Sequence, residues 1–433
     1  MHTRFRLAPV AAACALATLA AGAAARGEAG AFSIAVLPDT QNMIDYKHQK
    51  ASGFPIDASA LFLGQIDWIA GRAASKGGDV VFVAAVGDVW QHQSIGIDPA
   101  HAARGFTAIA NPWFVHELEA TPQTAAIELP TARAGYARLA AAEIPFGVAP
   151  GNHDYDAMWS DARYPPVSDA SRIDMTAKTL GMLHIGGLEN FRAVFGAQSA
   201  FFAGKPWYVA SHAGGTSSAQ TFAAGGYTFL HVALEMSPDD AVLAWAASVL
   251  AAHPGLPTIV STHDYLNANG ERRANPIIDL AAADPAHNGA EDLWRELIRP
   301  NDQIFLVLCG HHHGVATRTD ANAAGHAVHQ LLADYQDRGQ AALDAGALRV
   351  RGRPTPIGDG WLRLLTFDTA AEIPTLSVRT YSPHYRAYAD ELAAYAAWYK
   401  QDEDQRLGDA AFVSKDAFVV RLPDFRARFG AAR

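Results

Sequence analysis

Five stretches of the chain share one pattern: a run of β-branched and other apolar residues followed by a small cluster of polar residues. They are FSIAVLPDTQN (32–42), DVVFVAAVGDVWQ (79–91), IPFGVAPGNHDY (144–155), PTIVSTHDY (257–265) and DQIFLVLCGHHHG (302–314). Continuous apolar runs of this length are typical of strands that are buried on both faces. We therefore predict five core strands, each of which ends in polar residues.

Apolar residues recur at helical spacing in four other segments, 61–75, 131–142, 241–252 and 290–298. Strands that alternate with helices predict βαβ units and a mainly parallel sheet, so the predicted fold class is α/β. In α/β sheets of this kind the ligand site lies beyond the carboxyl ends of the strands. All five polar clusters fall at such ends, which makes them the first candidates for a functional site.

Later segments have a different pattern. Residues 360–368 and 374–382 alternate apolar and polar side chains, which predicts two half-exposed strands that pair as a hairpin or meander. Beyond them, 385–405 has the spacing of an amphipathic helix, and 411–422 has the composition of a last strand.

Two stretches, 98–130 and 158–189, interrupt the alternation of strands and helices. We interpret them as surface insertions, because long loops within a compact domain are often functional lids. No linker divides the chain, so we predict one domain over 32–382 and a C-terminal extension, 383–433, that packs on its core.

The first residues predict an export signal. The basic stretch MHTRFR is followed by an Ala/Leu-rich segment and by small residues up to Ala25, which is typical of a secretory signal peptide over 1–25. The apolar segment is too short for a comfortable membrane span. Cys14 lies within it, with Ala11 where a lipobox prefers leucine, so we expect a periplasmic or secreted protein without a lipid anchor.

Charge and cysteine usage narrow the range of partners. The net charge at pH 7 is −10, and loss of Arg4 and Arg6 with the signal peptide would take it to −12. Nucleic acids and anionic membranes usually require a basic face, so we expect neither as the main partner. Cys309 would be the sole cysteine of the exported chain, which excludes an intramolecular disulfide. The fold must then depend on a large core or on metal.

The strand-end clusters contain side chains that can coordinate metal ions. The eight candidates are Asp39, Gln41, Asp88, Asn152, His153, His263, His311 and His313. Imidazole suits Zn, Fe and Mn, whereas carboxylate and amide oxygens suit harder ions such as Mn and Mg. The set is too large for one ion and about large enough for two. A pair of metals roughly 3.5–4 Å apart is a standard device for hydrolysing phosphate esters.

At these residues the sequence resembles the calcineurin-like metallophosphoesterase family, whose motifs run D-x-H, G-D, G-N-H-[DE], a lone His and G-H-x-H. The matching stretches here, in the same order, are Asp39–Gln41, Gly87–Asp88, Gly151–Asp154, His263 and Gly310–His313. The resemblance extends over about 32–382. It implies a four-layer α/β/β/α sandwich with mixed sheets and a metal site at the carboxyl ends of the strands.

The resemblance implies a role for each matching ligand. The first metal would be held by Asp39 and His313, the second by Asn152, His263 and His311, and both by a bridging Asp88. His153 would lie over the substrate, with Asp154 orienting its ring. His312 is expected to point elsewhere, as a solvent-facing or rim histidine.

Gln41 departs from the family pattern, which usually has histidine at this position. A glutamine carbonyl oxygen can coordinate a hard ion but cannot act as a nitrogen donor. Gln41 is therefore either a ligand of the first metal in a variant site or a residue beside the ligands. An oxygen at this position shifts the expected preference from Zn or Fe towards Mn or Mg, with Mn favoured.

The activity implied by the resemblance is hydrolysis of phosphomonoesters or small phosphodiesters. A metal-bridging hydroxide would attack phosphorus in line, and His153 would protonate the leaving oxygen or hold a phosphate oxygen. Two alternatives stay open: a weakly active or inactive pseudoenzyme that binds a surface or a carbohydrate, and an extracellular nuclease, which the acidic charge disfavours. The sequence leaves the natural substrate and the oligomeric state open.

Other histidines are expected to have no ligand role. The segment 225–236 reads as a strand carrying His231 and Glu235, and we expect His231 to be structurally buried because the family offers no metal role there. We also expect no ligand role for His253, His287, His326 and His329.

Overall fold

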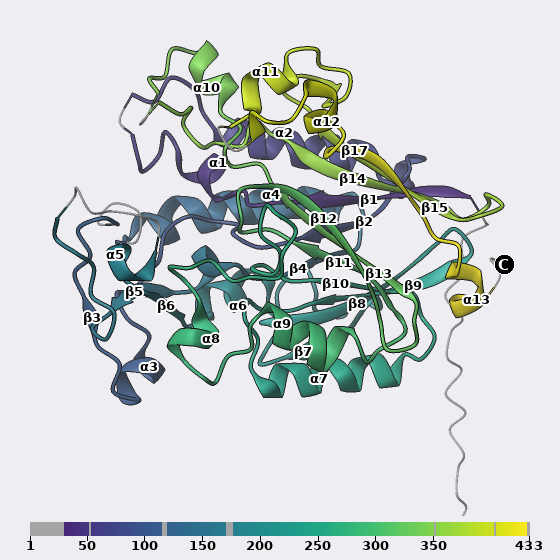
Figure 1. The fold of residues 1–433 in the computed structure, drawn as a ribbon, viewed down its shortest axis with the longest axis horizontal. Coiled ribbons are helices and arrows are strands. Elements are labelled where there is room, and N and C mark those ends of the chain that lie inside the picture. The colour runs from purple at the N-terminus through teal and green to yellow at the C-terminus, as the bar shows by residue number, and fades with distance from the viewer. Residues whose placement is uncertain are drawn as a thin grey trace, which may run out of the picture.

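The computed structural model describes residues 30–51, 53–114, 119–169, 176–349, 352–401 and 404–430. The predicted signal peptide, 1–25, lies outside the described residues. The described chain is a mixed α/β structure that contains two large mixed sheets (Figure 1). None of its described helices is both long enough and apolar enough to cross a bilayer.

The first large sheet has the strand order β16-β15-β14-β1-β2-β4, and β17 also pairs with β15. Its strands are β1 (Ala31–Leu37), β2 (Val80–Ala85), β4 (Phe146–Val148), β14 (Leu362–Asp368), β15 (Thr375–Ser382), β16 (Ala387–Tyr388) and β17 (Ala417–Arg421). The central pairs β1–β2 and β2–β4 are parallel, whereas β14, β15, β16 and β17 join by antiparallel pairing.

The second large sheet has the order β12-β13-β11-β10-β9-β8-β7. Its strands are β7 (Tyr208–His212), β8 (Ser217–Ala224), β9 (Tyr227–Ala233), β10 (Thr258–Ser261), β11 (Ile304–Cys309), β12 (Gly314–Ala321) and β13 (Ala327–Asp334). Strands β9, β10, β11 and β13 run parallel, and antiparallel strands complete both edges.

Helices lie between and around these strands. The α-helices are α1 (Gln41–Asp45), α2 (Ser59–Gly71), α3 (Pro99–Ala103), α4 (Leu129–Ala141), α5 (Ala177–Leu180), α6 (Glu189–Phe195), α7 (Asp240–Ala252), α8 (Leu280–Ala283), α9 (Ala290–Leu293), α10 (Gln340–Asp344), α11 (Tyr395–Tyr399), α12 (Asp409–Val413) and α13 (Phe425–Phe429). Short 3₁₀ turns are η1 (Ala74–Lys76) and η3 (Asn152–Asp154), and π-helical turns are η2 (Thr124–Glu128) and η5 (Trp294–Ile298).

Strand β1 shows why the apolar runs are continuous. Successive side chains of a strand point to opposite faces, so a strand buried on both faces needs apolar residues at every position. Ile34 and Val36 belong to a core that also contains Phe305 of the second sheet. Ala35 and Leu37 belong to a different core, which includes residues of α2 and α4. The first sheet is therefore buried between the second sheet and these helices.

The second sheet is covered in the same way on its outer face. Leu230 and Val232 of β9 share a core with Val242 of α7 and Leu293 of α9. Figure 1 shows α7 and α9 against this sheet and α2 on the far side of the first sheet. The two sheets thus face one another, and helices cover their outer faces.

The five predicted core strands are confirmed as β1, β2, β4, β10 and β11, and the four predicted helices correspond to α2, α4, α7 and α9 with its π-helical continuation. The sheets are mixed, as the resemblance implies, and not mainly parallel, as the alternation of strands and helices alone predicts. The two strands predicted over 360–368 and 374–382 are confirmed as the antiparallel pair β14–β15. Short turns can join antiparallel strands, whereas parallel pairs need long crossovers. Near the C-terminus, α11 is the one α-helix among the described residues of the predicted helix 385–405, and the predicted strand 411–422 is β17 preceded by α12.

The two predicted insertions form a small third sheet with each other. Strand β3 (Ala108–Ile109) lies in the first insertion and pairs with β5 (Ala157–Asp161), which pairs with β6 (Leu183–Gly186) of the second. Asn111 also donates hydrogen bonds to Ser160 Oγ at 2.6 Å and to the Leu180 carbonyl at 2.8 Å. The insertions are therefore one joined subregion beside the large sheets.

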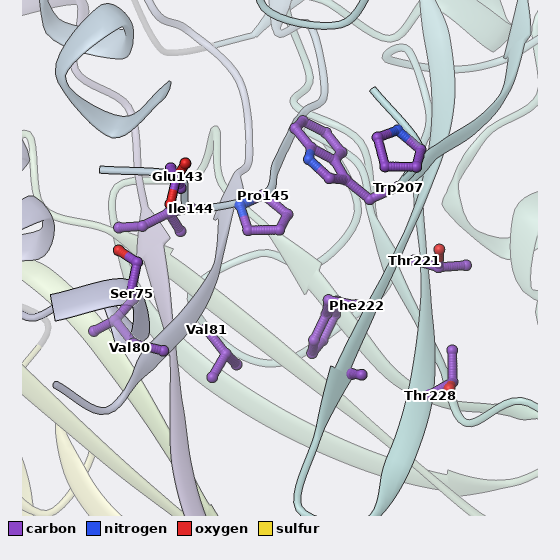
Figure 2. A pocket seen from close by; sticks show the side chains of 13 residues that line it. Ser75, Val80, Val81, Glu143, Ile144, Pro145, Trp207, Thr221, Phe222 and Thr228 are labelled. Atoms are coloured by element: carbon purple, nitrogen blue, oxygen red, sulfur yellow. The ribbon is translucent and has the colours of Figure 1, made fainter. Parts of the chain in front are cut away.

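At the amino ends of β2 and β4, the two sheets part around a cavity of about 320 Å³. Figure 2 shows Val81 and Phe222 lining it from opposite sheets, with Pro145 and Trp207 beside it. Among its lining residues, Glu143 is the single carboxylate and there is no histidine. The amino ends of these strands therefore lack the group of carboxylate and imidazole donors that follows their carboxyl ends.

Candidate metal centre

The residues predicted to hold metals follow the carboxyl ends of five strands from both large sheets. Asp39, Asp88 and Asn152 come after β1, β2 and β4 of the first sheet, and His263 and His311 come after β10 and β11 of the second. Parallel central strands place these ends along the same edge of each sheet. Because the sheets face one another, the two edges meet.

Asp88 is a point of convergence. Its Oδ2 atom accepts a hydrogen bond from Gln41 Nε2 at 3.0 Å and lies 3.2 Å from His263 Nε2. Its Oδ1 atom accepts from the backbone amide of His153 at 2.9 Å. Three of the predicted motifs therefore meet at one carboxylate.

His263 connects the remaining predicted ligands. Its Nε2 atom lies 3.1 Å from Asn152 Oδ1, 3.2 Å from His311 Nδ1 and 3.9 Å from Asp39 Oδ1. The amide of His311 also donates to Asp39 Oδ1 at 3.0 Å, across a sequence separation of 272 positions. The structure thus brings together Asp39, Gln41, Asp88, Asn152, His263 and His311, as the motifs predict.

The glycines of two motifs permit this close approach. A Cβ atom at Gly151 would lie 2.2 Å from Asp88 Oδ1, and one at Gly310 would lie 2.3 Å from Asp39 Oδ2. Neither position could carry a side chain without displacing a carboxylate. Asp88 and His311 also have positive φ angles of 51° and 71°. Such conformations cost about 1–3 kcal/mol per residue and are common at functional sites.

Hydrogen bonds to backbone carbonyls fix two histidine rings. His263 Nδ1 lies 2.7 Å from the Val86 carbonyl oxygen, and His153 Nδ1 lies 2.6 Å from that of Gln91. A carbonyl can only accept, so each Nδ1 donates a proton. The Nε2 atom of His263 is the one that faces Asp88 and Asn152. This is the usual arrangement of metal-binding histidines.

The rings of His312 and His313 each pair with a carboxylate outside the group that contacts Asp88. His312 Nε2 bonds Asp264 Oδ1 at 3.0 Å, so the histidine at the cavity rim is anchored by a buried carboxylate rather than free in solvent. His313 Nδ1 bonds Asp337 Oδ1 at 2.8 Å, and 45% of its side chain is exposed. His313 has no hydrogen bond to Asp39 among the described residues. Although burial opposes the change, the nearby Asp334, Asp337 and Asp39 nevertheless raise the pKa of its ring to about 10.

Asp154 differs from its predicted role. Its Oδ2 atom accepts from the Gly151 amide at 2.8 Å, and its Oδ1 atom accepts from the Val89 amide at 2.8 Å. The ring of His153 is oriented instead by the carbonyl of Gln91. Asp154 joins the loops that carry Asp88 and His153 because buried backbone amides need acceptors. Burial raises its pKa to about 8.

Asp334 is a site residue that the motifs missed. It is the last residue of β13, which runs parallel to β11, so it reaches the same edge as His311. Its Oδ1 atom accepts from the Gln336 amide at 2.8 Å, whereas Oδ2 is buried without a hydrogen-bond partner. Burial raises its pKa to about 6. The one available signal was its position at the end of the run AVHQLLAD (327–334), which was not predicted as a strand.

Carboxylates concentrate negative charge at this edge. Burial raises the pKa of Asp39 well above its usual range, and the Asp334 carboxylate adds to the rise. Asp88 behaves differently: although burial opposes the change, His263 and His153 lower its pKa. An ionised Asp39 is therefore unfavourable in these surroundings unless a further positive charge is present.

The donor atoms fit divalent metal ions. Four buried atoms of this cluster have no hydrogen-bond partner among the described residues: Asp39 Oδ2, Gln41 Oε1, His311 Nε2 and Asp334 Oδ2. A buried polar atom left unpaired costs about 1–3 kcal/mol. Donor atoms of Asp88, His263 and His311 also lie within 4.8 Å of one another. Oxygen and imidazole donors together suit ions such as Mn, Fe and Zn.

A cavity of about 610 Å³ opens over this cluster. Its polar lining residues include Gln41, Asp88, Asn152, His153, His311, His312 and His313. Its apolar lining residues include Phe114, Met158 and Leu183 of the insertions together with Ile277 and Ile278. Lys50 is the single lysine or arginine among the lining residues. The cavity has the size of a small-molecule site.

Comparison with known proteins supplies no function. No family model matches the chain. A stretch of 166 residues is 31% identical to the uncharacterized protein YvnB of Bacillus subtilis (strain 168) and covers 37% of this chain. The match covers 10% of that protein, so the chain corresponds to about a tenth of the length of this relative.

Proposed function

We propose that the protein is a metal-dependent phosphoesterase that hydrolyses small phosphomonoesters or phosphodiesters. The observation that carries this proposal is the group of buried oxygen and nitrogen atoms without hydrogen-bond partners, of which those of Gln41 and His311 belong to residues that line a cavity of small-molecule size. Two facing sheets with helices on their outer faces also agree with the four-layer α/β/β/α sandwich of the metallophosphoesterases.

Two divalent ions, with Mn favoured, would be held by the clustered donors. Asp88 lies between the two groups of ligands and is suited to contact both ions, because Gln41 approaches it from one strand end and His263 from another. Asn152 and His311 lie on the His263 side. When bound, the ions would neutralise phosphate charge and lower the pKa of water towards about 7, which makes hydroxide available at neutral pH.

The remaining ligands would come from the side of Asp39. Asp39 Oδ2 and Gln41 Oε1 are buried donors without partners, and Asp334 Oδ2 adds a third. His313 would contribute Nε2, because its Nδ1 is held by Asp337 in the carboxylate–histidine arrangement common around metals. The Nε2 of Gln41 donates to Asp88, so this residue can both hold Asp88 and offer its own oxygen.

His153 would exchange the proton of the reaction. Its ring lines the cavity, and its Nδ1 is fixed on the Gln91 carbonyl. Nε2 is therefore the ring atom that can give a proton to a leaving oxygen or hold a phosphate oxygen. Proton transfer of this kind contributes about 10²–10⁴-fold to the rates of enzymes.

The test is hydrolysis of p-nitrophenyl phosphate and of its bis ester by the full chain, reconstituted with Mn²⁺ and measured with and without a chelator. We expect chelator-sensitive turnover of at least one ester and none in the Asp39→Asn/Asp88→Asn double variant. Metal binding without turnover of either ester would favour a binding module instead. Equal turnover by the double variant would place the activity elsewhere.

A further inference from the structure

A second cluster of histidine and carboxylate side chains lies away from the candidate metal centre. His101 belongs to α3, Asp284 follows the end of α8, and His287 lies in the next loop, on the side of the molecule where Figure 1 shows α3 and α8. One donor atom from each residue lies within 4.8 Å of those from the other two. Donors bound to one zinc ion are about 3–4 Å apart because each bond is about 2.0–2.2 Å long. Small side-chain rotations would bring the three donors to one ion.

Both rings are oriented as metal-binding histidines are. His101 Nδ1 lies 2.7 Å from Asp98 Oδ2, and His287 Nδ1 lies 2.9 Å from the carbonyl oxygen of Ser237. Acceptors at Nδ1 leave Nε2 as the ring atom that can bind an ion. The Nε2 atom of His101 is buried and has no hydrogen-bond partner among the described residues. An ion at this position would be its missing partner.

The charges of the cluster permit a cation. Asp284 Oδ2 pairs with Arg104 at 2.6 Å, and Oδ1 accepts from the Ala286 amide at 3.1 Å. Each carboxylate oxygen has a further lone pair. The Arg104 side chain is 47% exposed, so solvent screens its charge from the cluster.

We propose that His101, Asp284 and His287 bind one zinc-type divalent ion, with solvent in the fourth position. Two imidazoles and one carboxylate form a donor set that suits zinc. The ion would connect the first insertion to the loop after α8, which are far apart in the sequence. This inference is independent of the proposed phosphoesterase function.

The experiment measures tightly bound metal by mass spectrometry of the full chain after incubation with Zn²⁺ and gel filtration. The background is the Asp39→Asn/Asp88→Asn double variant, which removes the candidate metal centre. We expect this background to retain about one ion per chain, and the further change His287→Ala to abolish that ion. His326→Ala, a histidine paired with Asp302 elsewhere, serves as the matched control and should retain it.

Equal metal content with and without His287→Ala would overturn the inference. Should the His287→Ala chain not fold, cobalt titration of the background supplies a second readout. One equivalent of Co²⁺ should give the intense visible absorption of a low-coordinate nitrogen and oxygen site, and Zn²⁺ should displace it. Absence of that absorption would also overturn the inference. Both readouts are made without the candidate centre, so their failure leaves the proposed function untouched.

Arg104→Gln distinguishes an ion site from a plain ion pair. Removal of the competing cation should raise the affinity of the background variant for Zn²⁺ several-fold, because the charge of Arg104 opposes that of the ion. If Asp284 serves only to pair with Arg104, the Arg104→Gln variant will bind Zn²⁺ no more tightly than the background variant does, or will not bind it at all. Either result overturns the inference.

Discussion

His231 and His263 are both completely buried, and they come from neighbouring parallel strands, yet their surroundings differ. His231 lies within β9, where its ring nitrogens are 2.8 Å from Gln220 Oε1 and 2.8 Å from Ser261 Oγ. Both partners are neutral, and burial lowers the pKa of His231 to about 3. Its hydrogen bonds are complete, so His231 is a structural residue of the sheet interior.

His263 lies just beyond the end of β10, at the carboxyl edge of the same sheet. Although burial opposes the change, Asp88 and Asp39 raise the pKa of His263 to about 10. Its neighbours include His311, whose Nε2 is buried without a partner among the described residues. The comparison teaches that burial alone does not identify a site. A site is indicated instead by buried charge at a strand end together with neighbouring polar atoms that lack hydrogen-bond partners.

The largest effect is expected from Asp88→Asn. The change keeps the shape of the side chain but removes the charge on which three motifs converge, so turnover of p-nitrophenyl phosphate should be abolished. Bound Mn should fall at the same time, because the bridging carboxylate is lost. A rate assay and a metal analysis of the same sample measure the turnover and the bound Mn. Unchanged turnover would show that the strand edge is not the active site.

His153→Ala should lower turnover by roughly 10²–10⁴, the range for loss of a positioned acid. Bound Mn should stay at the wild-type level, because His153 contributes its amide rather than its ring to the Asp88 contact. Steady-state rates over a range of pH provide the measurement. Loss of metal together with activity would make His153 a ligand instead.

At His231 we expect the opposite outcome. His231→Leu leaves Gln220 and Ser261 without their buried partner, so the free energy of unfolding should fall by roughly 1–3 kcal/mol. Metal content and turnover of the folded protein should be unchanged. Urea unfolding tests the predicted loss of stability, and metal analysis tests the predicted unchanged metal content. Loss of metal in this variant would end the distinction between the sheet interior and its edge.

The pH dependence of stability sharpens the same point. Because the folded state keeps His231 neutral down to about pH 3, only the unfolded state takes up its proton as the pH falls below about 6.5. The unfolding free energy should therefore decrease on acidification, by up to about 1.4 kcal/mol per pH unit from this residue. The difference in unfolding free energy between wild type and His231→Leu, measured as a function of pH, isolates the contribution of His231. A difference that is independent of pH would contradict the assignment.

The smallest effect is expected from Gln41→His. Replacing the amide by imidazole supplies a nitrogen donor, which should shift the metal preference from Mn or Mg towards Zn or Fe. Competition between Mn²⁺ and Zn²⁺ in the wild type and the variant measures the shift. An identical preference would leave Gln41 as a residue that only holds Asp88.

The core strands and most of the site could be predicted from the sequence. Strands buried on both faces need continuous apolar runs, and β1 and β11 have them. The site motifs follow these runs directly, so Asp39 and His311 could be placed at one edge before any coordinates were known. The structure explains the glycine of the last motif, because a Cβ atom at Gly310 would lie 2.3 Å from Asp39 Oδ2.

What the sequence could not predict depends on contacts between distant segments. The run that leads to Asp334 contains His329 and Gln330, which hide its character as a buried strand. The direction of His313 depends on Asp337. The partners of Asp154 are backbone amides, which have no sequence signature. Each of these depends on packing rather than on local pattern.

The central claim is that the clustered carboxylates, amides and imidazoles at this strand edge hold a pair of metal ions. The most direct test is the metal content of the full chain after reconstitution with Mn²⁺, compared with that of the Asp39→Asn/Asp88→Asn double variant. The account predicts that the wild type binds about two more ions per chain than the double variant. A difference of less than one ion would contradict it.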